Sequence, residues 1–127
     1  SAGNYVYRLT FDLTGFIPET ASISGRWAVD NTGQDIKING VSTGNFLSSS
    51  LPIGFVDFNT INEGFVEGLN TLDFLVRNEP NATGINPTGL RVEFLSATAA
   101  PVPVPAAVWL LSSGLLALIG IARRGKE

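Results

Sequence analysis

An uncharged, apolar run over residues 106–122 constrains this chain more than any other feature of its sequence. As an α-helix the run would be roughly 25 Å long, the short end of what crosses the hydrocarbon core of a bilayer. Ser112 and Ser113 interrupt it, but their hydroxyls can bond to the helix backbone. Because the run is apolar on all sides, we expect a transmembrane helix rather than the buried helix of a soluble protein.

Charge is distributed unevenly on the two sides of this helix. Residues 123–127 carry Arg123, Arg124 and Lys126 against Glu127, which gives +2; because the whole chain carries −3, residues 1–122 carry −5. By the positive-inside tendency, the basic end lies in the cytoplasm and the preceding chain lies outside it. An acidic body does not attract phosphate backbones, so we expect no nucleic-acid partner.

A proline-rich stretch precedes the apolar run. Prolines stand at positions 101, 103 and 105, and each disfavours helix for the residue before it. We therefore expect four parts: a domain at 1–98, an extended Pro-rich linker at 99–105, the transmembrane helix at 106–122, and a basic cytoplasmic end at 123–127.

Residues 1–98 show the period-two alternation of β-strands. Apolar and polar side chains alternate over residues 5–13 and again over 21–30, which is typical of half-buried strands. Gly15 and Pro18 are expected to separate the two, and Asn39-Gly40 has the composition of a two-residue hairpin turn. Further strands are expected at 35–38, 41–43, 54–61, 72–77 and 89–97, with loops at 44–53 and 79–88.

This pattern predicts a mostly β chain, folded as an antiparallel, jelly-roll-like β-sandwich of roughly six or seven short strands. Turn residues separate the strands, and no helical period occurs before residue 105. The residues expected to face the core are Leu9, Phe11, Ile23, Trp27, Leu72, Phe74, Val76, Leu90, Val92 and Phe94.

Catalysis finds little support in the composition. The chain has no histidine and no cysteine, so nucleophile–imidazole pairs and thiolate metal sites are absent. The carboxylate pairs Asp30/Asp35 and Asp57/Glu63 sit in turn-rich segments, where acids are ordinarily solvated or bound to backbone amides. We expect a protein that is not an enzyme.

The end of the chain resembles a known sorting signal. Residues 102–124, VPVPAAVWLLSSGLLALIGIARR, are similar to the VPxPA variety of the PEP-CTERM signal of Gram-negative surface proteins, although Val104 stands where most members carry Glu. The shared parts are the proline-spaced motif, the short apolar helix and the arginine pair: Val102, Pro103, Val104, Pro105, Ala106, Arg123 and Arg124. The resemblance implies export by a signal peptide, cleavage near the motif by a membrane exosortase, and a link to exopolysaccharide, biofilm or floc formation.

The body of the chain has a resemblance of its own. Residues 27–45 and 64–78 look like a recurrent domain of PEP-CTERM proteins and are similar to galactose-binding-like jelly rolls. The resemblance covers roughly residues 5–98 and implies a jelly roll with another strand or two before Tyr5. The matching positions are Ile38, Asn39, Gly40, Gly68, Asn70, Leu72, Phe74, Val76 and Asn78.

Two kinds of ligand deserve a residue-level expectation. Asp30, Asn31 and Asp35 offer oxygen ligands beside a turn, as calcium prefers, and jelly rolls of the resembled class often hold a structural calcium; a hydrogen-bonded Asx turn explains the same residues and is the interpretation we favour. No other cofactor is expected. A sugar would need an exposed aromatic ring; the candidates are Trp27, Phe46 and Phe55, of which we expect only Phe46 to be exposed.

These features lead to two hypotheses about function. The first is an exported surface or matrix protein, sorted by its tail and working through surface or exopolysaccharide contacts. The second is a structural subunit, a homo-oligomer or part of a larger assembly, whose retained apolar helix packs in a membrane complex or filament. The start at Ser1, without a leader, fits either a removed signal peptide or the edge of a fragment.

Overall fold

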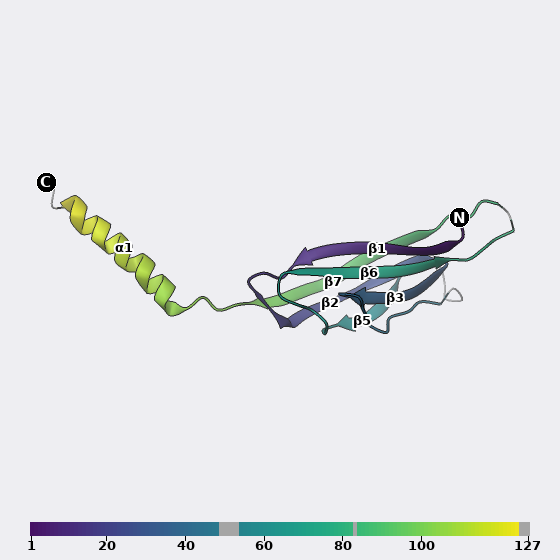
Figure 1. The fold of residues 1–127 in the computed structure, drawn as a ribbon, viewed down its shortest axis with the longest axis horizontal. Coiled ribbons are helices and arrows are strands. Elements are labelled where there is room, and N and C mark those ends of the chain that lie inside the picture. The colour runs from purple at the N-terminus through teal and green to yellow at the C-terminus, as the bar shows by residue number, and fades with distance from the viewer. Residues whose placement is uncertain (49–53, 83, 125–127) are drawn as a thin grey trace.

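Two antiparallel β-sheets and one separate C-terminal helix make up the structure, a computed structural model that describes residues 1–48, 54–82 and 84–124 (Figure 1). One sheet has the strand order β1-β6-β3-β4 and the other β5-β2-β7. The elements are β1 (Gly3–Asp12), β2 (Phe16–Asp30), β3 (Thr32–Ile38), β4 (Val41–Ser42), β5 (Val56–Ile61), β6 (Leu69–Asn78), β7 (Gly89–Pro101) and α1 (Ala106–Arg124). The expectation of a mostly β chain in a sandwich-like pair of sheets, followed by one apolar helix, is confirmed.

The core lies between the sheets and is centred on Trp27, whose side chain is 1% exposed. Its indole packs against the ring of Phe74, with ring centroids 6.0 Å apart. Gly33 makes this packing possible, because a Cβ atom at that position would overlap the indole. The expected inward-facing residues Ile23, Trp27, Leu72, Phe74 and Val76 are buried, and Phe11, Leu90 and Val92 pack partly buried against them.

Two residues assigned to the core are not buried. Leu9 and Phe94 are each 44% exposed, so their assignment to the core was wrong. The reason is their place in the sheets: β1 and β7 are edge strands, each paired on one side only among the described residues. An inward-facing side chain on these two strands has a neighbour strand on one side only, and Leu9 and Phe94 are left partly uncovered.

The boundaries of several strands differ from expectation, and two of the differences involve prolines. Pro18 was expected to interrupt the chain, yet β2 starts at Phe16 and runs through it. The register between β2 and β7 shifts between Ile17 and Ser22, and proline, which lacks an amide donor, is tolerated at such an irregularity. At the other end β7 continues to Pro101, which takes in the first three residues of the expected 99–105 linker.

The expected hairpin at Asn39-Gly40 is confirmed. Ile38 of β3 pairs with Val41 of β4, and both turn residues have positive φ, 49° for Asn39 and 82° for Gly40. Part of the expected loop 44–53 behaves differently: Leu47 is buried and bridges Gly33. Residues 49–53 of that loop lie outside the described residues.

Candidate functional site

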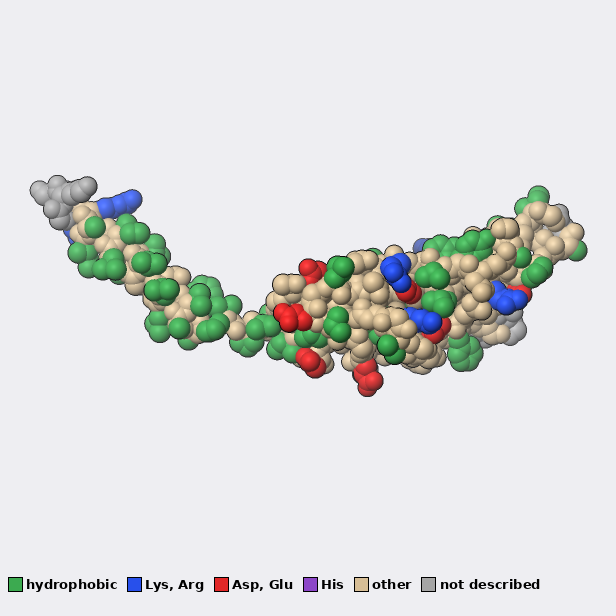
Figure 2. Space-filling model, in the orientation of Figure 1, with side chains coloured by type: hydrophobic (Ala, Val, Ile, Leu, Met, Phe, Trp, Pro, Cys, Tyr) green, Lys and Arg blue, Asp and Glu red, His purple; other side chains and the backbone are tan. Residues whose placement is uncertain are grey.

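Helix α1 has no side chain buried against the rest of the chain. It is long and apolar enough to cross a membrane. Figure 2 shows hydrophobic side chains over its visible face and basic side chains near its far end, where Arg123 and Arg124 occupy the last turn. The Ser112 hydroxyl donates to the Val108 carbonyl at 3.0 Å, so this polar group is satisfied within the helix, as an apolar solvent requires.

Residues 102–105, called the connecting segment below, join β7 to α1 without helix or strand. All four residues are exposed, with Val102 and Val104 just over half exposed. The Val102 amide donates to the Gly15 carbonyl at 2.9 Å, and the Pro105 carbonyl accepts from the Val108 amide at 3.0 Å. The segment between these two hydrogen bonds is therefore exposed.

The predicted tail residues thus divide into two places. Val102, Pro103, Val104 and Pro105 form the connecting segment, and Ala106 opens the helix. Arg123 and Arg124 lie at the opposite end of α1, so the structure does not bring the two groups together.

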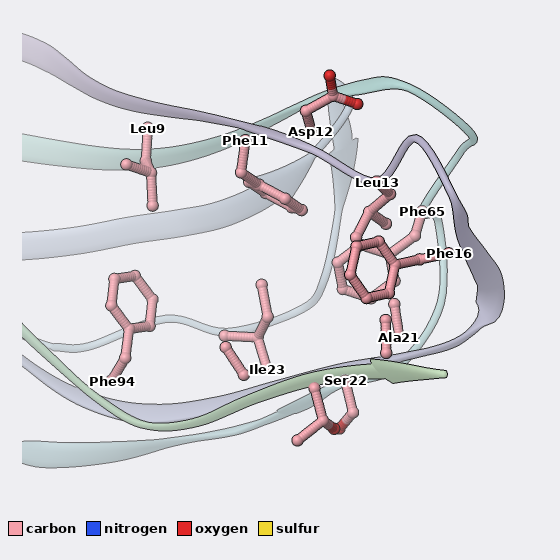
Figure 3. A pocket seen from close by; sticks show the side chains of 13 residues that line it. Leu9, Phe11, Asp12, Leu13, Phe16, Ala21, Ser22, Ile23, Phe65 and Phe94 are labelled. Atoms are coloured by element: carbon pink, nitrogen blue, oxygen red, sulfur yellow. The ribbon is translucent and has the colours of Figure 1, made fainter. Parts of the chain in front are cut away.

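An apolar groove lies between the edge strands β1 and β7, in the half of the domain nearest the connecting segment. Its volume is about 320 Å³. Figure 3 shows Leu9 and Phe11 pointing into it from β1, while the Asp12 carboxylate points away. Four phenylalanines line the groove: Phe11, Phe16, Phe65 and Phe94.

A second, more polar hollow of about 370 Å³ lies beside the β3–β4 hairpin. Glu63 lines it together with Ser42, Thr43, Thr60 and Asn62. Asp57, the suggested partner of Glu63, is not among the lining residues and lies opposite Arg26 in the β2–β5 ladder.

The candidate calcium ligands are already engaged in part. Asn31 Oδ1 accepts the Glu79 amide at 2.7 Å, a contact between residues 48 positions apart and not the local hydrogen bond of an Asx turn. Asp35 Oδ1 accepts the Ser42 hydroxyl at 2.9 Å. Asp30, at the end of β2, and Asp35, in β3, belong to different sheets. No cluster of three acidic side chains suited to a metal occurs among the residues that the structure describes. Calcium binding stays a prediction.

The three aromatic candidates have different surroundings. Trp27 is in the core, whereas Phe46 is 75% exposed, as expected. Two guanidinium groups lie against the Phe55 ring, those of Arg26 at 4.9 Å and Arg91 at 4.8 Å from the centroid. A sugar stacking on Phe55 would compete with these cation–π contacts.

Two asparagines of the body motif, Asn39 and Asn70, have a structural role. Asn70 is fully buried; its side-chain amide donates to the Val66 and Gly68 carbonyls, and its Oδ1 accepts from the Val66 amide and from Asn39. Asn39 in turn donates to the Gly64 carbonyl and accepts the Thr71 amide. This network ties the hairpin turn to the loop before β6, so the resembled motif maintains the fold in the structure.

Sequence reasoning missed the ion pairs, of which the one between Arg8 and Asp73 has the most buried carboxylate among the described residues. Arg8 of β1 binds both carboxylate oxygens of Asp73 in β6, at 2.6 and 2.7 Å. The Asp73 side chain is only 7% exposed, and the hydrogen bonds from Arg8 hold the pKa of its carboxyl below the usual 3.8. The signal was Asp73 inside an apolar strand, but only the β1–β6 register identifies Arg8 as its partner.

Comparisons with known proteins add no relative. No family model, no curated protein and no solved structure matches this chain. What the chain does is therefore inferred from its own residues.

Proposed function

We propose that this chain is an exported, non-catalytic surface or extracellular-matrix protein that is sorted by its C-terminal end. The single observation that carries the proposal is the order of parts: an accessible connecting segment, a helix with no buried side chain, and two arginines. A helix that is apolar on all sides needs an apolar environment, which a bilayer supplies. The domain then lies outside the cytoplasm, and Arg123 and Arg124 lie at the cytoplasmic side of the membrane.

In this proposal each part of the end has one task. The Pro-rich linker, of which residues 102–105 are exposed, offers an extended backbone to an exosortase-type peptidase. Helix α1 holds the substrate in the membrane, and the arginines fix its direction. The two sheets form a jelly-roll-like ectodomain that associates with exopolysaccharide or biofilm. Phe46 is its most exposed aromatic side chain among the candidates.

The proposal includes no chemistry by the domain itself. Asp73 and Arg8 neutralise each other, and Asp12 is held by the hydroxyl and amide of Thr14. Hydrolysis of a glycan or ester that is lost in Asp30→Asn or Glu63→Gln would contradict this part.

A structural subunit is the second candidate. The observation that favours it is the surface of α1, where Ser113, Gly114 and Ala117 offer small side chains that let another helix approach closely. In that case the helix keeps its place in the assembly and the connecting segment stays intact.

The test uses the chain behind a signal peptide, with and without a co-produced exosortase-type peptidase. We expect an uncleaved membrane form without the peptidase, and with it a product whose intact mass places the cut within residues 102–106. Pro103→Ala combined with Pro105→Ala should prevent the cut and leave membrane insertion unchanged. An intact chain with the peptidase, found in a large assembly after lipid removal, would support the structural subunit instead.

A further inference from the structure

An apolar place is left open between two edge strands, one from each sheet. β1 ends the four-stranded sheet and β7 ends the three-stranded sheet, and both border the same apolar groove. Leu9 from β1 and Phe94 from β7 point into it although both are 44% exposed. An occupant of this groove would bury both side chains.

The lining suggests what kind of molecule the groove accepts. Its phenylalanines and aliphatic side chains offer hydrophobic contact, whereas Figure 3 shows the Asp12 carboxylate turned outward. Both bordering strands pair on one side only among the described residues, so backbone groups along their outer edges can bond to an added extended segment. An extended, apolar peptide therefore matches the groove better than a polar ligand.

The connecting segment has these properties. Its sequence, Val-Pro-Val-Pro, is extended, and Val102 and Val104 are exposed at alternate positions. The two prolines have no amide proton, so the segment brings fewer donors that would have to be satisfied on burial. Aromatic-lined grooves are a known setting for preformed Pro-rich segments.

The groove and the connecting segment also lie at the same end of the domain. Phe16, which lines the groove, is opposite Pro101 in the β2–β7 ladder, and Ala99 lines it too. In its own chain the segment is fixed to Gly15 and then leads away to α1 (Figure 1). A second copy held in the same membrane presents its segment at the same height.

We propose that the groove of one copy binds residues 102–105 of a second copy, and the reverse, in a dimer whose two helices enter the same membrane. This rests on the proposed membrane anchoring by α1. The contact is small compared with standard protein interfaces, so confinement in the membrane supplies the effective concentration that the contact needs. Bound in this way, the segment is covered, and dimerisation protects it from the sorting peptidase.

The chain has no cysteine, which allows a direct test. Leu9→Cys and Val104→Cys are made in separate full-length chains, mixed in lipid vesicles and oxidised. Val41→Cys is the matched control for the groove side, since Val41 is also exposed but lies in β4, at the opposite edge of the same sheet. We expect the Leu9/Val104 pair to form at least about ten times more disulfide-linked dimer than the Val41/Val104 pair.

A second variant tests whether the cross-link depends on the apolar lining of the groove. Phe94→Glu places a charge in the lining, and in the Leu9→Cys chain it should reduce cross-linking to the level of the control, while circular dichroism shows the sheets intact. Equal cross-linking of Leu9 and Val41 would show random collision and overturn the proposal. Binding of an apolar fluorescent probe that Val104→Glu leaves unchanged, without cross-linking, would assign the groove to a lipid chain and also overturn it.

Failure here is distinguishable from failure of the proposed function. Flotation of the same vesicles reports whether the chain is inserted at all. A chain that floats but gives only the control level of dimer contradicts the proposed dimer and is consistent with membrane anchoring by α1. A chain that does not float contradicts both.

Discussion

The β-sheets and helix α1 use apolar side chains in opposite ways. Trp27 is 1% exposed and surrounded by the core, whereas Trp109 in α1 is 67% exposed and belongs to a helix with no buried residue. The sheets therefore supply their own apolar surroundings, and the helix depends on surroundings from outside the chain. A substitution in one region should leave the other unchanged, and each prediction below tests that separation.

The largest change in stability is expected from Trp27, and Trp109 should cause none. Trp27→Ala removes the centre of the core and should lower the free energy of unfolding by about 3–5 kcal/mol, measured by denaturant titration of the sheets. Trp109→Ala is the matched control and should leave the unfolding midpoint where it was. A loss below about 1 kcal/mol for Trp27→Ala would mean that the inward face of β2 is wrongly assigned.

A charge in the middle of α1 should impair membrane association and leave the sheets folded. Leu115→Arg opposes membrane insertion by about 2.5–3.5 kcal/mol and should move the chain from the membrane to the soluble fraction. The sheets should keep their circular dichroism spectrum, because α1 makes no core contact. Leu115→Ile, which keeps the apolar surface, serves as control. Unfolded sheets in the Arg variant would show that the two regions are one unit.

Two glycines, one in the sheets and one in α1, test the same separation with a smaller expected change in stability. Gly33→Ala pushes a Cβ atom into the Trp27 indole and should cost about 1–3 kcal/mol of stability. The corresponding Gly114→Ala meets no atom within 4 Å, and alanine favours a helix by about 0.5–1 kcal/mol. In thermal unfolding of the sheets, we expect a lower midpoint for Gly33→Ala and no loss of stability for Gly114→Ala. Equal destabilisation by the two would contradict the separation.

The smallest effect is expected from pH. Because Arg8 lowers the pKa of Asp73 below 3.8, the contribution of this pair is complete above about pH 4 and is lost as pH falls through the lower folded value. Asp73→Asn should therefore flatten the loss of thermal stability below pH 4, and Arg8→Gln should flatten it similarly. Residues 106–122 contain no titratable group, so membrane association should not change over the same range. A slope unaffected by either variant would refute the role of the pair.

Local patterns predicted the parts of this molecule that depend on neighbours in sequence. Alternation identified the inward face at Ile23, Trp27 and Leu72, and Asn39-Gly40 identified the hairpin. Alternation does not tell which strands become edges, and for this reason Leu9 and Phe94 were misassigned. The groove between β1 and β7 follows from strand order, which no local pattern contains.

The candidate site at the end of the chain was predictable because it is linear. The connecting segment, the helix and the arginines follow one another in sequence, and their exposure needs no tertiary partner. By contrast, Asn70 reaches the hairpin turn through Asn39, and Leu47 enters the core from a Ser- and Gly-rich loop. Neither contact has a periodic signal.

Strand β7 leads directly into the connecting segment, and this has a mechanical consequence. When the domain is held outside and the helix resists from the membrane, tension acts along β7. Its ladder with β2 extends from Phe16 opposite Pro101 to Asp30 opposite Gly89, and the hydrogen bonds of an antiparallel pair are perpendicular to the strands. Force along the strand would therefore load many of these bonds together instead of peeling them one by one.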